Sequence, residues 1–100
     1  MSGGTRIKTG AYTGTGSALN VTTVGFRPKK VELLNATGLV TAFWTDSMAD
    51  ASAHKIINHD TAQNVVITSA GITPLANGFT VGTDADLNTA AETVHWIAHE

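Results

Sequence analysis

The chain has 100 residues, a formal net charge of −2, no cysteine and only 14% charged residues. A chain of this length forms one domain and can bury roughly two thirds of the surface that it exposes when unfolded. The near-neutral charge argues against duplex nucleic acid as a partner, because such proteins carry a basic face. Disulfides and thiolate chemistry are excluded, and no apolar segment is long enough to span a bilayer.

Short runs rich in Thr, Val, Ile and aromatic residues alternate with turn-forming Gly, Asn, Asp and Ser, which is typical of β-strands. The runs that we interpret as strands are, in chain order, residues 6–13, 18–24, 30–35, 40–45, 55–59, 64–68, 78–82 and 93–99. Residues 46–53 lose the alternation, and we expect a loop or one helical turn there. No longer segment has helical periodicity.

The sequence therefore predicts an all-β protein. We expect a single antiparallel β-sandwich, or a small barrel, of about eight short strands. We expect this domain to span residues 6–100 and residues 1–5, which contain two glycines, to form a flexible N-terminal arm.

An acidic run with residues at alternate positions, Asp84, Asp86 and Asn88, is the first candidate for a metal site. An EF-hand loop beginning at Asp84 would need glycine at its sixth position and a bidentate carboxylate at its twelfth. Those positions hold Thr89 and His95. We interpret the run as a turn whose Asp and Asn side chains accept hydrogen bonds from nearby amides; cation binding in an irregular loop is the alternative.

The four histidines do not have the spacing of a metal site. His54 and His59 are five apart on a strand, which points them to opposite faces. His95 and His99 share a face, but their Cα atoms would lie about 13 Å apart. Bonds to one zinc are only about 2 Å long, so this pair cannot share a zinc ion. We predict no metal and no cofactor.

Motifs for catalysis are missing from the sequence. It has no G-x-S-x-G nucleophile elbow and no phosphate-binding or dinucleotide-binding glycine pattern. The carboxylates fall mostly in predicted turns, whereas glycoside hydrolysis needs a pair of them in a cleft. We therefore predict that the protein is not an enzyme.

Several motifs occur in one order along nearly the whole chain. They are YTGTG at residues 12–16, GFRPKKV at 25–31, FWTD at 43–46, and GFTVG, DLN and ETVHWIA in the last quarter. In this order and spacing they resemble a β-rich module of structural proteins of tailed bacteriophages. There the module occurs on long tail and fibre proteins, whereas this chain carries a single copy.

The resemblance implies a virion protein, made in the host cytoplasm, that acts by binding. The main interpretation is a capsid decoration protein that stabilises the assembled lattice of the major capsid protein. We expect a homo-oligomer, with a trimer at a three-fold site as one arrangement. The first alternative is a tail or tail-fibre module that binds a receptor or carbohydrate, and the second is a non-viral sugar-binding or calcium-binding module.

Five residues are candidates for an interface. Trp44 and Trp96 each share a strand face with apolar residues, which favours the core, but either could instead be an exposed platform or an interface anchor. Arg27, Lys29 and Lys30 form the one local basic cluster. Such a cluster usually protects an edge strand; its other interpretation is contact with an acidic capsid surface.

Overall fold

In the computed structural model, which describes residues 6–58 and 61–100, the chain forms eight β-strands and no helix. The strands are β1 (Ile7–Thr13), β2 (Leu19–Val21), β3 (Lys30–Asn35), β4 (Val40–Thr45), β5 (Ser52–Ile57), β6 (Gln63–Leu75), β7 (Gly78–Val81) and β8 (Thr93–His99). The predicted N-terminal arm and His59 lie outside the described residues.

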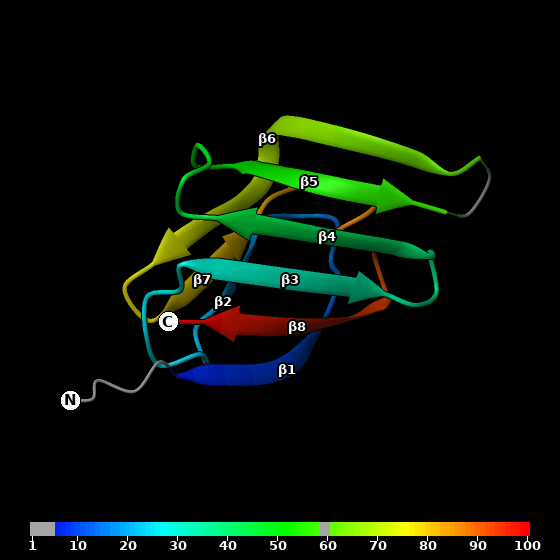
Figure 1. The fold of residues 1–100 in the computed structure, drawn as a ribbon. Coiled ribbons are helices and arrows are strands. Elements are labelled where there is room, and N and C mark those ends of the chain that lie inside the picture. The colour runs from blue at the N-terminus through cyan, green and yellow to red at the C-terminus, as the bar shows by residue number, and fades with distance from the viewer. Residues whose placement is uncertain (1–5, 59–60) are drawn as a thin grey trace.

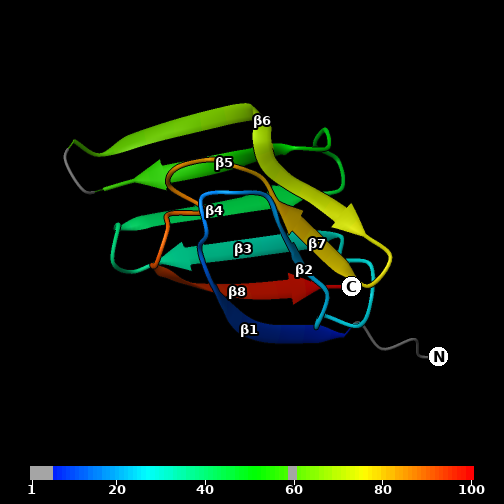
Figure 2. The same ribbon diagram turned by 180° about the vertical axis from the view of Figure 1, so that it is seen from behind.

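All eight strands belong to one antiparallel sheet with the order β1-β8-β3-β4-β5-β6-β7-β2. Strand β6 changes partner along its length: residues 63–67 pair with β5, and residues 72–75 pair with β7. The sheet therefore folds over at β6. Strands β7 and β2 lie behind the broad layer formed by β1, β8, β3, β4, β5 and residues 63–67 of β6 (Figure 1; Figure 2). The predicted all-β fold is confirmed as a nearly closed, barrel-like sheet.

The core fills the space between these two layers. Alternate side chains of β3, β4 and β8 point into it, so that Trp44 is 1% exposed and Trp96 is 2% exposed. Phe79 of β7 contacts Trp96 edge to face, with ring centroids 5.8 Å apart, which is a favourable aromatic geometry. Val31, Val94 and most of the other inward residues are also buried.

Three predicted strands differ from the structure by three residues or more at one end. The run at 18–24 forms a strand only at Leu19–Val21, because the chain turns at Gly25, whose φ is +86°. Strand β5 begins at Ser52, inside the predicted loop, where the Ser52 hydroxyl donates to the Ala49 carbonyl at 2.6 Å. Strand β6 continues to Leu75, since a register shift and the positive φ of Ala70 let it pass between layers without ending.

Candidate binding surface

The acidic run surrounds a lysine. The Lys55 ammonium donates to Asp84 Oδ2 at 2.9 Å and to Asp86 Oδ2 at 2.8 Å, although Lys55 lies on the inward face of β5. Asp84 Oδ1 also accepts from the backbone amides of Asp86 and Leu87, at 3.0 and 3.2 Å. The predicted turn between the last two strands is confirmed. Lys55 was not identified from the sequence as the partner of these carboxylates, because nothing near Lys55 in the sequence indicates the interaction.

Electrostatics explain why a buried lysine is tolerated. Burial lowers the pKa of Lys55, but hydrogen bonds and charge interactions with Asp86 and Asp84 outweigh it, and the net pKa is raised. A buried charge is stable only when it is paired and hydrogen-bonded, and both conditions are met here. Within residues 6–58 and 61–100, no group of three or more His, Asp or Glu side chains could hold a metal ion.

The rest of this segment, residues 82–92, is attached to the core by further polar contacts. Leu87 is 1% exposed, and the Tyr12 hydroxyl donates to its carbonyl at 2.7 Å. The buried Asn88 accepts from the Thr15 amide at 2.8 Å and donates to the Ser17 carbonyl at 2.6 Å. We call residues 82–92 the β7–β8 connection; its polar groups serve the fold and leave little for a ligand.

The basic cluster is partly neutralised by its surroundings. Arg27 and Lys29 are exposed, while Lys30 is half-buried at the start of β3. Arg27 and Lys29 line a small hollow of about 170 Å³ together with Asp46 and Asp50. Because two carboxylates share the hollow, it does not present the uniform positive field that recognition of an acidic surface would use.

Trp44 and Trp96 belong to the core, as the alternation of their strands favoured. Trp44 donates from Nε1 to the Ala49 carbonyl at 3.1 Å. Trp96 packs against Gly10, where even a Cβ would lie 2.5 Å from the indole. Side chains so fully buried offer little area to a partner, which counts against both tryptophans as interface residues.

The face of the broad layer that points away from the core carries a different set of residues. Strand pairing places its outward side chains in two rows across the sheet, running from β1 to β6. The first row is Ala11, His95, Leu34, Thr41, Ile56 and Asn64, and the second is Thr9, Ile97, Glu32, Phe43, His54 and Val66. We call this surface the outer face.

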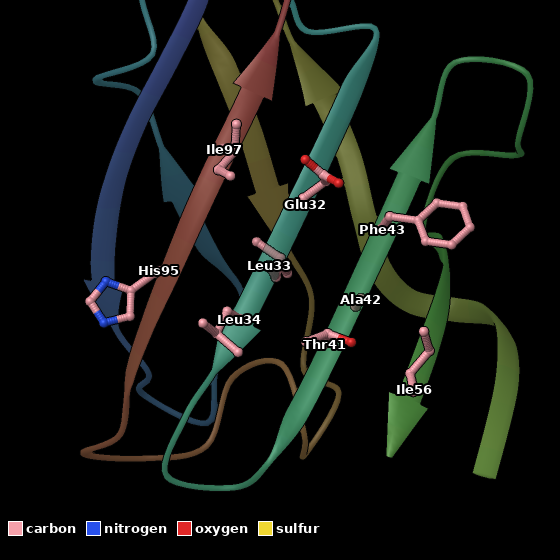
Figure 3. A pocket seen from close by; sticks show the side chains of 9 residues that line it. All are labelled: Glu32, Leu33, Leu34, Thr41, Ala42, Phe43, Ile56, His95 and Ile97. Atoms are coloured by element: carbon pink, nitrogen blue, oxygen red, sulfur yellow. The ribbon is translucent and has the colours of Figure 1, made fainter. Parts of the chain in front are cut away.

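Large aliphatic side chains are exposed on the outer face. Leu34 is 45% exposed, Ile56 42%, Ile97 39% and Val66 67%. Figure 3 shows that the side chains of Leu34, Ile56 and Ile97 come from three different strands of one continuous layer. Monomeric proteins expose single apolar residues often, but contiguous patches usually mark an interaction site.

The patch is hollowed into a shallow groove. A hollow of about 360 Å³ lies between β8 and β5 and is lined by outward side chains such as Leu34, Phe43 and Ile97 (Figure 3). A second hollow, of about 300 Å³, adjoins it towards Leu39 and shares Leu34, Thr41 and Ile56. Together they form one open apolar surface along the layer.

Polar groups on the outer face contact their neighbours on it. Glu32 Oε2 lies 3.3 Å from Nε2 of His99, which follows Ile97 on the same side of β8, just beyond the two rows. The rings of His54 and Phe43 meet edge to face, with their centroids 4.9 Å apart. Such a surface binds by burying apolar area, with a few polar side chains at its margin. The adjacent Leu33 and Leu34 were a usable signal, because on a strand only one of two neighbours can face the core.

Comparison of the chain with protein-family models, with curated proteins and with solved structures found no match. The resemblance to the phage module therefore depends on the sequence motifs alone. In the described part of the chain, no helix has the length and apolar character needed to cross a membrane.

Proposed function

We propose that this chain is a binding protein of a tailed-phage virion that decorates the capsid and uses the outer face to dock on the assembled lattice. The observation that carries the proposal is the exposed aliphatic set Leu34, Ile56 and Ile97 around an open groove. The order of motifs along the sequence supplies the virion context.

The shape and chemistry of the groove favour a protein surface as its ligand. The groove is broad, open and mostly apolar, whereas small-molecule sites are concave and bury most of their ligand. Docking on two or more neighbouring capsid subunits would bury the aliphatic set. Because binding would favour the assembled lattice over free subunits, it would stabilise the capsid by mass action.

The second candidate is a module on the tail or tail fibre that binds a receptor or carbohydrate. Sugar recognition commonly uses an exposed aromatic platform, and the outer face offers Phe43, which is half-buried against His54. Both tryptophans are buried, which weakens this candidate.

The number of copies in each particle separates the two candidates. Quantitative mass spectrometry of purified particles would compare this chain with the major capsid protein. A count equal to the capsid protein, or a simple fraction of it, is expected for lattice decoration. A handful of copies would support the tail assignment, and absence from the particle would contradict both.

The docking face is tested by adding purified protein to particles that lack it and measuring co-sedimentation. We expect Leu34→Lys and Ile97→Lys each to weaken binding at least tenfold, because each places a charge in the apolar groove. Thr23→Lys is the matched control, since Thr23 is exposed and lies next to β2, away from the outer face. Equal binding by all three variants would exclude the outer face.

A further inference from the structure

Among the residues that the structure describes, the sheet has three free strand edges, and one of them is unprotected. Strands β1 and β2 end the strand order, and residues 63–67 of β6 pair only with β5, because β7 pairs with residues 72–75. Figure 1 shows this first half of β6 running along the outside of the broad layer. Among the described residues, 6–58 and 61–100, no strand pairs with its other edge.

Proteins usually protect such edges with charge, proline, a bulge or a very short strand. Strand β2 has only three residues, and β1 carries the exposed Lys8. The first half of β6 has five paired residues, none of them charged or proline. Its unpaired amides and carbonyls are therefore open to another strand.

Several apolar side chains of this segment also lie outside the core. We call residues 54–57 of β5 and 63–67 of β6 the β5–β6 arm. Ile56 and Val66 of the arm are exposed on the outer face, and Val65 on the other face is only half-buried. The molecule is 46 Å in its longest dimension and 24 Å in the next.

We propose that the free edge of β6, residues 63–67, pairs antiparallel with the same segment of a second copy of this chain across a two-fold axis. A strand paired with itself in this way is self-complementary, so one segment supplies both halves of the interface. A charged residue in this segment would meet its own copy near the two-fold axis, and the like charges would oppose pairing. No charged residue occurs between positions 61 and 83. This uncharged edge fits a second copy better than it fits a charged partner.

Such pairing would join two broad layers into one. The outer faces of the two copies would become continuous, with Val66 and Ile56 of each copy near the junction. The inference does not depend on the proposed function, because it concerns the isolated chain. A single paired strand is a small interface, and so we expect a weak, concentration-dependent dimer.

The first test is sedimentation equilibrium of the purified full chain from micromolar to millimolar concentration. We expect a reversible dimer that Val66→Lys weakens at least tenfold, because two lysines would face each other near the axis. Thr9→Lys is the matched control, since Thr9 lies at the opposite end of the same outward row, on β1. A monomer at every concentration, or a dimer insensitive to Val66→Lys, would overturn the proposal.

A second measurement does not depend on the strength of the dimer. The chain has no cysteine, so single cysteines can be introduced at chosen positions. Under mild oxidation Val66→Cys should form an intermolecular disulfide much faster than Thr9→Cys. Equal rates for the two variants would contradict pairing through β6.

Discussion

The β7–β8 connection and the β5–β6 arm are opposite in construction. The connection contains no strand, yet Leu87 and Asn88 within it are almost fully buried and hydrogen-bonded. The arm has an unbroken ladder of paired strands, yet exposes Ile56 and Val66. Regular backbone pairing therefore does not tell where the stability lies. In this chain the irregular segment is structural, whereas the regular one leaves apolar side chains exposed.

The largest effect is expected from removing the Lys55 ammonium, which reaches from β5 to two carboxylates of the connection. Lys55→Met removes the positive charge that Asp84 and Asp86 share beneath the sheet. Loss of one member of a buried ion pair typically costs about 3–5 kcal/mol of unfolding free energy. Urea denaturation would measure the loss.

Lys30→Met is the matched control for this change. Lys30 Nζ lies 3.6 Å from Glu32 Oε1, and both side chains are more than 40% exposed. Exposed pairs contribute about 0–1 kcal/mol. Equal losses for the two variants would show that the Lys55 cluster is not a buried interaction.

Substitution of one asparagine in each segment compares the stability contributions of the connection and the arm directly. Asn88→Ala removes the partners of the Thr15 amide and the Ser17 carbonyl, and unsatisfied buried groups of this kind cost about 1–3 kcal/mol. Asn64→Ala removes only an exposed contact to His54 at 3.3 Å, so we expect a change within about 0.5 kcal/mol. Thermal unfolding of both variants measures the difference, and a larger loss at Asn64 would reverse the comparison.

The contact between Tyr12 and the connection should make the protein sensitive to alkali. Burial raises the pKa of Tyr12 above its ordinary value of 10.0, and the net pKa of Lys55 is also raised, above 10.5. Both groups keep their protons more tightly in the folded state, so their contribution to stability is complete below about pH 10. It is lost as the pH rises through the folded-state values.

Tyr12→Phe isolates one part of this effect. At neutral pH the variant loses the hydrogen bond to the Leu87 carbonyl, which is worth about 1 kcal/mol. Above pH 10 it should lose less additional stability than the wild type, because the titrating group is gone. Denaturation at several pH values would show this, and parallel curves for the two proteins would contradict the assignment.

The smallest effect on stability is expected on β6, the outer strand of the arm. Val66→Thr keeps the branched shape of a side chain that is 67% exposed, so the unfolding free energy should change by less than about 0.5 kcal/mol. Amide hydrogen exchange provides a sharper comparison. In dilute protein the amides of residues 63–67 that point to the free edge should exchange faster than the amides of Leu87 and Asn88. The latter two donate hydrogen bonds to Asp84 within a turn.

Much of the fold could be predicted because side-chain alternation is a local signal. Strands β3, β4 and β8 have the predicted bounds, 30–35, 40–45 and 93–99, and the two tryptophans lie in the core. Local patterns also indicated the turn at Asp84. The long strand β6 was not predicted, because a bulge that carries a strand from one layer to another depends on contacts distant in sequence.

The candidate site was harder to predict than the fold. Basic residues and tryptophans attracted attention as residue types, but the structure pairs or buries most of them. The exposed aliphatic set depends on strand order, which places Leu34 between β8 and β4 and brings Ile97 and Ile56 onto one surface. Such long-range neighbours are not visible in a single sequence, although the Leu33-Leu34 pair indicated that one leucine faces outward.

The most direct test of the docking proposal is hydroxyl-radical footprinting of the chain, free and bound to virus particles. We expect Leu34, Ile97 and Phe43 to be strongly protected on the particle, while Tyr12 and Trp44, already buried in the free protein, change little. Protection confined to the region of Arg27 and Lys29, with the outer face still reactive, would contradict the account.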